Sequence, residues 1–164
     1  MIWTVRLLSI CLVLLVLGCA TGISRQARSQ VTYRGSFPAL QTASDEHVGK
    51  IVMFGGKVIE TKTYPSSSEI TVLQLPLGSS NRPQDGDRSE GRYLIRSEQF
   101  LDPAIYQKGR LLTVVGRLSG SEVRSIGGFE YDYPVLEAIE LKPWPQGRKT
   151  SPIFHFGIGV GTWF

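Results

Sequence analysis

The first 19 residues constrain everything that follows them in this chain. Arg6 is the only charged side chain in this segment, and an apolar run of 11 residues, Leu7–Leu17, leads to Gly18 and Cys19. A positive residue, a short apolar core and a small residue at the cut are the parts of a secretory signal. As a helix the run would cover about 16 Å, too short for a hydrocarbon core about 30 Å thick. The sequence therefore predicts a cleaved signal peptide over residues 1–18.

The end of this segment, Val16-Leu17-Gly18-Cys19, resembles the lipobox of bacterial lipoproteins, although a leucine is commoner at the position of Val16. The resemblance implies a diacylglyceryl thioether on Cys19, cleavage after Gly18 and usually a third acyl chain on the new amine. Two or more acyl chains make a stable membrane anchor, at about 0.8 kcal/mol per buried CH₂ group. The alternative is an ordinary secretory signal whose cleavage site falls near a cysteine.

Removal of the signal leaves 146 residues, enough for one domain with its own core and too few for two. Of the two cysteines, Cys11 leaves with the signal and Cys19 is occupied by the lipid. No disulfide is then possible within the mature chain, although exported proteins often use them. The domain is therefore expected to be stabilised by packing and hydrogen bonding alone.

Residues 19–45 are predicted to form a flexible, lipidated tether that lifts the domain off the membrane. They lack helical or strand periodicity and are rich in Ser, Thr, Gln and Arg. The whole chain carries a formal charge of +4 and the signal carries only Arg6, which leaves +3. Arg25, Arg28 and Arg34 supply much of it, and acidic head groups attract each such residue by about 1 kcal/mol. A solvated tether without a particular partner is the alternative.

Short apolar runs separated by turn residues begin at Val48 and indicate an all-β domain over residues 46–145. The predicted strands are Lys50–Thr61, Ile70–Leu77, Arg92–Arg96, Arg110–Leu118 and Tyr131–Leu141. The predicted connections include a turn at Tyr64–Ser68, a long loop at Gly78–Gly91 and a turn region at Ser119–Gly128. Gly55 and Gly56 predict a bulge or sharp bend in the first strand.

One short helix is predicted between the third and fourth strands. Asp102 followed by Pro103 is typical of an N-cap and a first helical position, and Gly109 of a left-handed stop. The helix would cover Ala104–Lys108. Five strands with a short helix in this place give the element order of the OB fold. The predicted fold class is a small five-stranded OB-like barrel, and a lone sandwich-like sheet is the alternative.

Several short motifs occur in order through this domain. They are Gly55-Gly56-x-Val58-Ile59, Val72-Leu73-Gln74-Leu75-Pro76-Leu77, Ser89-x-Gly91-Arg92, Phe100-Leu101-Asp102-Pro103-x-x-Tyr106-x-x-Gly109-Arg110, Thr113-Val114-Val115-Gly116, Ile126-Gly127 and Tyr131-x-Tyr133-Pro134-Val135. In this order they resemble the Slp family, outer-membrane lipoproteins of Gram-negative bacteria named for induction on starvation or in stationary phase. The resemblance covers roughly residues 46–145. Met53 stands where a tryptophan is expected, and the tail after Pro145 is not part of the core pattern.

The resemblance implies an outer-membrane address and no catalytic activity. Ala20 agrees with this address, because an aspartate after the lipidated cysteine is the familiar signal for retention in the inner membrane. The domain is expected on the periplasmic side rather than on the cell surface. It would be either a structural or interaction protein of the envelope, or a binding module for a small molecule, glycan or peptide. A filled barrel with one exposed apolar patch favours the first, and a large apolar-lined pocket favours the second.

The residues themselves predict neither catalysis nor a metal or cofactor site. His47 and His155 are the only histidines and stand far apart without neighbouring cysteines, whereas zinc needs three or four convergent ligands. No Gly-x-Ser-x-Gly elbow is present. The acidic segment Asp85–Glu90 fails as an EF-hand loop, because Arg96 stands where the twelfth ligand should be. Nucleic acid is not expected as a partner, because the second strand has no aromatic residue and the third only Tyr93.

Two further features leave alternatives open. Arg92, Asp102, Tyr106 and Arg110 could form a small polar recognition patch, or they could serve as a cap and hydrogen bonds around the short helix.

The second open feature is the tail Phe154–Phe164, which alternates apolar residues with glycines and ends on an aromatic residue. It could pair with an edge of its own domain, stay disordered, or insert into a membrane or partner and mediate self-association. A single strand cannot stand alone in lipid, because its backbone groups would be unpaired.

Overall fold

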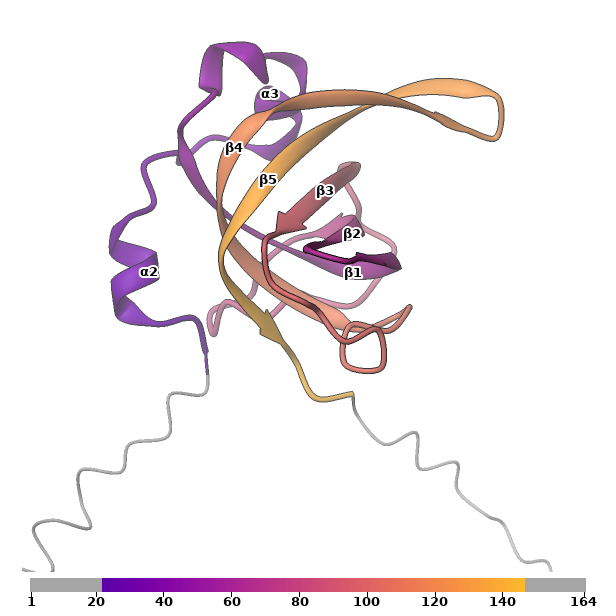
Figure 1. Cartoon of the computed structure of the whole chain (residues 1–164). Helices are drawn as coiled ribbons and strands as arrows, with labels where there is room; N and C mark the ends of the chain where they lie inside the picture. The colour runs from indigo at the N-terminus through magenta and orange to yellow at the C-terminus, as the bar shows by residue number, and fades with distance from the viewer. Residues whose placement is uncertain (1–21, 147–164) are drawn as a thin grey trace, which may run out of the picture.

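Five strands close into a barrel in which neighbours follow the order β1-β2-β3-β5-β4 (Figure 1). The computed structural model describes residues 22–146. The strands are β1 (Ile51–Tyr64), β2 (Ser67–Leu75), β3 (Arg92–Ser97), β4 (Leu111–Ile126) and β5 (Phe129–Pro143). Neighbouring strands are antiparallel, except that β3 and β5 are parallel. The predicted five-stranded OB-like barrel is confirmed, and the sandwich alternative is wrong.

The barrel interior is filled by apolar side chains from every strand. One continuous cluster contains Val52, Phe54, Val58, Ile70, Val72, Tyr93, Ile95, Leu112, Val114, Leu118 and Leu136. Gly56 allows β1 and β2 to approach each other closely, since a Cβ there would overlap the Val72 side chain and the Leu73 carbonyl. The register shift in β1 lies between Val58 and Glu60, not at the glycines where a bulge was predicted.

Residues 22–47 do not form the flexible tether that the sequence predicts. They contain α2 (Arg25–Ser29), α3 (Phe37–Thr42) and the 3₁₀ turn η1 (Asp45–His47), with Ser24 and Ser36 as side-chain N-caps of the two α-helices. These helices are too short to show an apolar period, and helices of this length depend on tertiary packing. Their apolar residues supply that packing, because Ile23, Ala27, Phe37 and Leu40 are all buried. The ordered domain therefore begins well before residue 46.

Both ends of the barrel are closed. At one end α3 inserts Phe37, whose ring centroid lies 5.4 Å from that of Phe54 and 5.9 Å from that of Tyr93. At the other end Leu101 and Tyr106, from the β3–β4 connection, pack against the same cluster.

The β3–β4 connection is a turn rather than the predicted helix Ala104–Lys108. The backbone N–H groups of Ile105 and Tyr106 both donate to the Asp102 carbonyl, which makes a single turn. It does not continue, because the Gly109 N–H donates to the Val58 carbonyl of β1 and draws the chain away. Gly109 has φ +86°, as predicted for a left-handed stop. No helix within residues 22–146 is long and apolar enough to cross a membrane.

Strands β4 and β5 extend beyond the barrel as a two-stranded arm (Figure 1). The predicted turn region Ser119–Gly128 is mostly strand, and only Gly127 and Gly128, with φ +56° and +92°, form the turn. Along β4 in the arm, half-buried residues alternate with exposed ones. Most of them are polar, so the sequence alone predicted a turn region here rather than a strand. The half-buried face curls over the outside of β3, where Leu94 packs against Tyr133 and Val135.

Candidate functional site

The structure brings together part of the predicted polar patch. Asp102, Tyr106 and Arg110 share the β3–β4 connection, where the Asp102 Oδ1 accepts a hydrogen bond of 2.8 Å from the Ala104 N–H. The Tyr106 carbonyl accepts a hydrogen bond of 2.7 Å from the Thr61 hydroxyl. Burial raises the pKa of Tyr106, and the charge of Arg110 acts in the opposite direction. Arg92 is not part of this group, because it begins β3 while the connection leaves from the other end of that strand.

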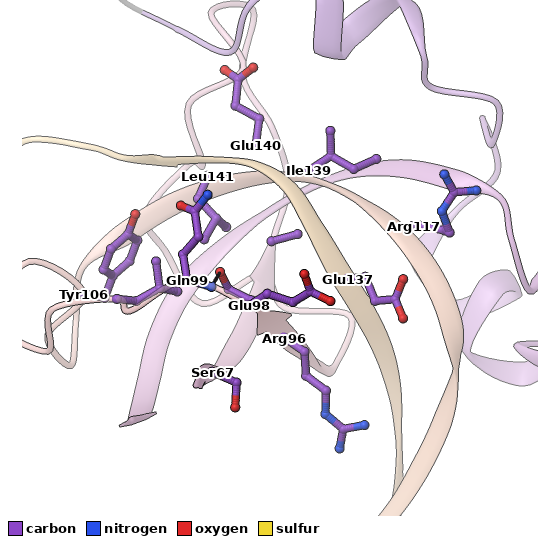
Figure 2. A pocket seen from close by; sticks show the side chains of 13 residues that line it. Ser67, Arg96, Glu98, Gln99, Tyr106, Arg117, Glu137, Ile139, Glu140 and Leu141 are labelled. Atoms are coloured by element: carbon purple, nitrogen blue, oxygen red, sulfur yellow. Dashed lines mark hydrogen bonds between the residues drawn. The ribbon is translucent and has the colours of Figure 1, made fainter. Parts of the chain in front are cut away.

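A groove of about 910 Å³ lies where β5 continues past the end of β3 (Figure 2). The two strands pair only over Leu94–Arg96 and Val135–Glu137, so β5 continues past β3 without another strand neighbour on that side among residues 22–146. We call this the β3–β5 groove. Its lining includes Arg96, Glu98, Leu101, Tyr106, Arg117, Glu137, Ile139, Glu140 and Leu141.

The β3–β5 groove combines apolar contacts with charges of both signs. Ile139 is 40% exposed within it, and Leu101 is buried beneath it. Arg117 and Glu137 stand opposite each other on β4 and β5, and both are exposed. Glu140 is already engaged, since its carboxylate accepts hydrogen bonds from the Ser24 N–H at 2.8 Å and the Ser24 hydroxyl at 2.6 Å. This lining suits recognition of an amphipathic ligand.

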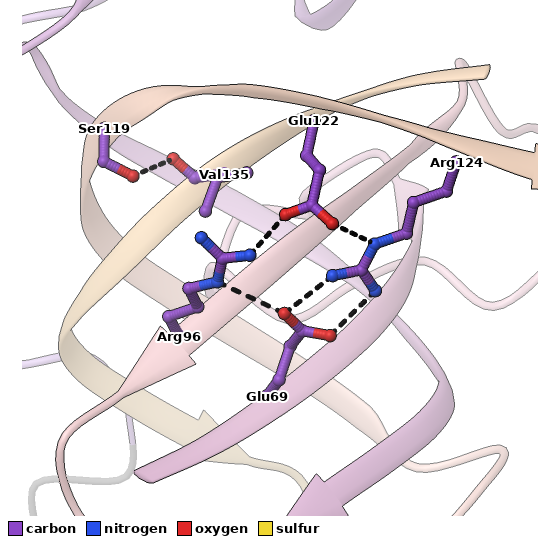
Figure 3. Close-up of polar contacts among 6 residues, drawn as sticks. All are labelled: Glu69, Arg96, Ser119, Glu122, Arg124 and Val135. Carbon is purple, nitrogen blue, oxygen red and sulfur yellow. Dashed lines mark hydrogen bonds and ion pairs between the residues drawn. The ribbon is translucent and has the colours of Figure 1, made fainter. Parts of the chain in front are cut away.

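An ion network of four residues fastens the arm to the barrel (Figure 3). Arg124 binds Glu69 with two parallel bonds of 2.8 and 2.9 Å and donates to Glu122 at 2.7 Å. Arg96 closes the ring by donating to Glu69 at 3.2 Å and to Glu122. Bidentate arginine–carboxylate pairs of this kind are stronger than single ion pairs.

The ion network lowers the pKa of both of its carboxylates, Glu69 and Glu122. The Glu69 side chain is only 8% exposed, and its burial acts to raise its pKa. Hydrogen bonds and charge from Arg124 and Arg96 outweigh that effect, so the pKa of Glu69 lies below its ordinary value. The hydrogen bond from Arg124 is the main cause of the lowered pKa of Glu122. Glu69 is therefore a buried carboxylate held in its charged form.

The arm covers the surface that OB folds commonly use for binding. That surface is the outer face of the second and third strands, between the loops that flank it. In this protein Glu69 binds Arg124 of β4, Arg96 binds Glu122 of β4, and Leu94 is buried under β5. The Tyr131 hydroxyl also accepts a hydrogen bond of 2.8 Å from the Arg92 N–H at the start of β3. The face is occupied by the chain itself.

The remaining candidates from the sequence have ordinary surroundings or lie outside residues 22–146. The His47 ring packs against Tyr33 with centroids 5.0 Å apart, and Asp85 pairs with Lys57. No group of three His, Cys, Asp or Glu side chains that could hold a metal ion occurs within residues 22–146. Cys19, His155 and the tail Phe154–Phe164 fall outside the described residues.

The sequence profile of the outer membrane lipoprotein Slp family matches residues 16–159. The chain belongs to this family. The match is wider than the resemblance over residues 46–145: it begins at Val16, in the lipobox-like segment, and ends inside the tail. The prediction that the tail after Pro145 lies outside the family's pattern is therefore wrong up to residue 159.

Relatives in the Slp family include two Escherichia coli proteins. The lipoprotein YeaY is 30% identical over 153 residues, which are 89% of this chain and 79% of YeaY. The outer membrane protein Slp is 26% identical over 138 residues, which are 82% of this chain and 73% of Slp. This chain is accordingly a lipoprotein of the bacterial envelope.

Solved structures that resemble the barrel include single-stranded DNA-binding proteins. The small one from Streptomyces coelicolor has a TM-score of 0.38 and 12% identity, covering 58% of this chain and 94% of that protein. The mitochondrial protein Rim1 from S. cerevisiae has a TM-score of 0.39 and 15% identity, covering 61% of this chain and 99% of Rim1.

Sequence reasoning missed both the β3–β5 groove and the ion network. Their residues come from three or more separate strands and connections, so no local motif marks them. The one available signal was the alternation of Glu122, Arg124 and Ile126 along β4, a period of two that is typical of a strand with one covered face.

Proposed function

We propose that this protein is a non-catalytic lipoprotein of the outer membrane, anchored through acyl chains on Cys19. Its barrel faces the periplasm and serves a structural or interaction role in the envelope, of use under starvation or other stress. The observation that carries this proposal is a filled barrel that is closed at both ends and covered on the outside of β2 and β3. Such a molecule offers surfaces to partners rather than an internal cavity to a substrate.

The anchor is tested by metabolic labelling with palmitate in a Gram-negative host. The wild-type chain should incorporate label, and Cys19→Ser should lose it because the thioether cannot form. Cys11→Ser is the matched control: it lies in the segment predicted to be removed and should label like the wild type. Equal labelling of wild type and Cys19→Ser would contradict the anchor.

A second test concerns the filled interior of the barrel. Tyr93 is fully buried in the barrel cluster, and its burial raises its pKa far above the ordinary value. Its hydroxyl has no hydrogen-bond partner within residues 22–146, and its ring belongs to the apolar cluster that fills the barrel. Tyr93→Phe should therefore leave stability nearly unchanged or increase it, because no hydrogen bond is lost.

A second candidate function, a binding module, is supported by the β3–β5 groove. Its volume and its mixture of apolar and charged groups suit a small molecule, a glycan or a peptide. The side of β5 that no strand within residues 22–146 covers favours an extended peptide, which adds to a strand edge through backbone hydrogen bonds.

Site-specific photo-crosslinking in intact cells separates the two candidates. A photoreactive residue at Ile139 should give a discrete adduct if the β3–β5 groove is the contact surface. The same residue at Glu130, exposed on the arm, is the matched control. Equal patterns at the two positions would exclude the groove as the contact surface and favour a role that does not depend on it.

A further inference from the structure

The first residues of the ordered domain are held firmly on the barrel. Ile23 is 4% exposed and packs with Ala27 against Val115 of β4. Ser24 follows, and both its N–H and its hydroxyl donate to the Glu140 carboxylate of β5. The position of Ile23 is therefore determined by the barrel.

This attachment leaves little chain between barrel and anchor. From Cys19 to Ile23 there are four residues, which span at most about 14 Å even when fully extended. A folded domain of this size has a radius of gyration of about 14 Å. If Cys19 carries the acyl chains, as the proposed function holds, the barrel lies directly beside the bilayer, and one particular side of it faces the lipid.

The residues that surround the chain entry, Gly22–Ser24, identify that side. A side chain at Gly22 would meet the Ser80 carbonyl oxygen at 3.9 Å, so the loop after β2 lies next to the entry. The same loop is tied to β4 by a hydrogen bond of 2.6 Å from the Thr113 hydroxyl to the Asn81 carbonyl.

The chain exit, Trp144–Gln146, lies on the same side of the domain and contacts the same loop. The indole N–H of Trp144 donates to the Thr113 hydroxyl at 2.9 Å, and the Arg82 guanidinium lies 5.7 Å from the centre of the Trp144 ring. Arg82 also donates to the Pro145 carbonyl at 3.3 Å. The described chain thus begins and ends on one side of the domain, as Figure 1 shows.

We propose that this side is a membrane-facing edge, formed by Gly22–Ser24, the loop Gly78–Arg82 and Trp144–Gln146, and that it lies against the phospholipid surface. Arg25 and Arg28, exposed on α2 within five residues of Ile23, supply positive charge beside it for acidic head groups. The orientation goes beyond the anchor itself, because a long tether would leave every side of the domain free to face the lipid.

The tip of the arm lies at the end of the molecule opposite the membrane-facing edge. The Trp144 N–H donates to the carbonyl of Leu111, the first residue of β4, so β4 starts beside the membrane-facing edge. Its 16 residues, at about 3.3 Å each, carry the chain roughly 50 Å along the strand to the tip. Phe129, 79% exposed at that tip, lies far from the membrane in this arrangement.

Fluorescence quenching by spin-labelled lipids tests the orientation. Full-length lipidated protein with a fluorophore on Ser80→Cys or on Phe129→Cys is placed in vesicles of phosphatidylethanolamine and phosphatidylglycerol that contain nitroxide head groups. Cys19 is acylated and does not react with the dye. The Ser80 label should lose most of its emission, and the Phe129 label should keep it.

Two controls separate the possible failures. An insert of about 20 Gly and Ser residues after Ala20 adds a reach of about 25 Å and should weaken the quenching at Ser80. Protein that floats with the vesicles but shows equal quenching at both labels overturns the orientation and leaves the anchor intact. Protein that does not float with the vesicles overturns the anchor and the orientation together.

Discussion

At the residue scale, Glu69 makes the ion pairs that hold the arm on the barrel, although no sequence pattern indicated this role. It is a nearly buried carboxylate on β2 that joins β3 and β4 through two arginines. Hydrogen bonds to charged groups contribute about 1.5–3 kcal/mol each when buried, more than exposed surface ion pairs. Glu69 therefore fixes the arm over the barrel.

Glu69→Gln should destabilise the domain by about 1.5–3 kcal/mol at neutral pH, because the charge that both arginines bind is lost. The pKa of Glu69 is lower in the folded protein than its ordinary value of 4.5, so the charged form stabilises the fold. This contribution is fully present above about pH 4.5 and is lost as the pH falls through the lowered folded value. The gap in melting temperature between wild type and variant should therefore close in acid.

Glu130→Gln is the control for this prediction, since Glu130 is an exposed acid on the same arm. It should change the melting temperature little at either pH. A gap for Glu69→Gln that persists unchanged at pH 3 would show that the effect does not come from the carboxylate charge.

At the scale of elements, the two short N-terminal helices belong to the core. Phe37 and Leu40 of α3 belong to the barrel cluster, and Ile23 and Ala27 cover the outside of β1 and β4. The helix N-caps Ser24 and Ser36 fix where each helix begins. A domain cut at residue 46 would lose all of these contacts.

A fragment of residues 46–146 should be unstable, whereas residues 22–146 should fold. Loss of a buried Phe or Leu side chain alone costs about 2–5 kcal/mol, against a total stability of roughly 5–15 kcal/mol for a typical domain. Circular dichroism melting of the two fragments measures the difference. Phe37→Ala in the longer fragment should lower its melting temperature by itself, and equal stability of the two fragments would place α2 and α3 outside the folding unit.

At the scale of the whole molecule, the anchor and the tail leave from the same edge. Trp144 and Pro145 contact the loop that also lies beside Gly22. Phe154 follows Gln146 by eight residues, which reach at most about 28 Å. In the proposed orientation, the tail Phe154–Phe164 starts within reach of the bilayer. The β3–β5 groove lies beside the same edge, because Glu140 lines the groove and also binds Ser24 at the chain entry.

Deletion of residues 150–164 distinguishes the roles that the sequence allows for the tail. A truncated protein that keeps its melting temperature but loses a cross-linked oligomer in membranes identifies the tail as an assembly element. A lower melting temperature without a change in assembly identifies it as part of the domain's own sheet. Reducing agent should change neither variant, because the cleavage predicted after Gly18 removes Cys11 and leaves Cys19 without a second cysteine.

The sequence by itself determined the family, the presence of five strands and the left-handed turn at Gly109, and it predicts the export signal. These depend on local patterns: an apolar run with a cysteine, alternating side chains, and a glycine where φ is positive. Only the tertiary structure decided that residues 22–47 are ordered, that the arm covers β2 and β3, and that a groove opens beside β5. Each of these depends on contacts between distant residues, such as Ser24 with Glu140 or Glu69 with Arg124, whose energies exist only once the barrel has closed.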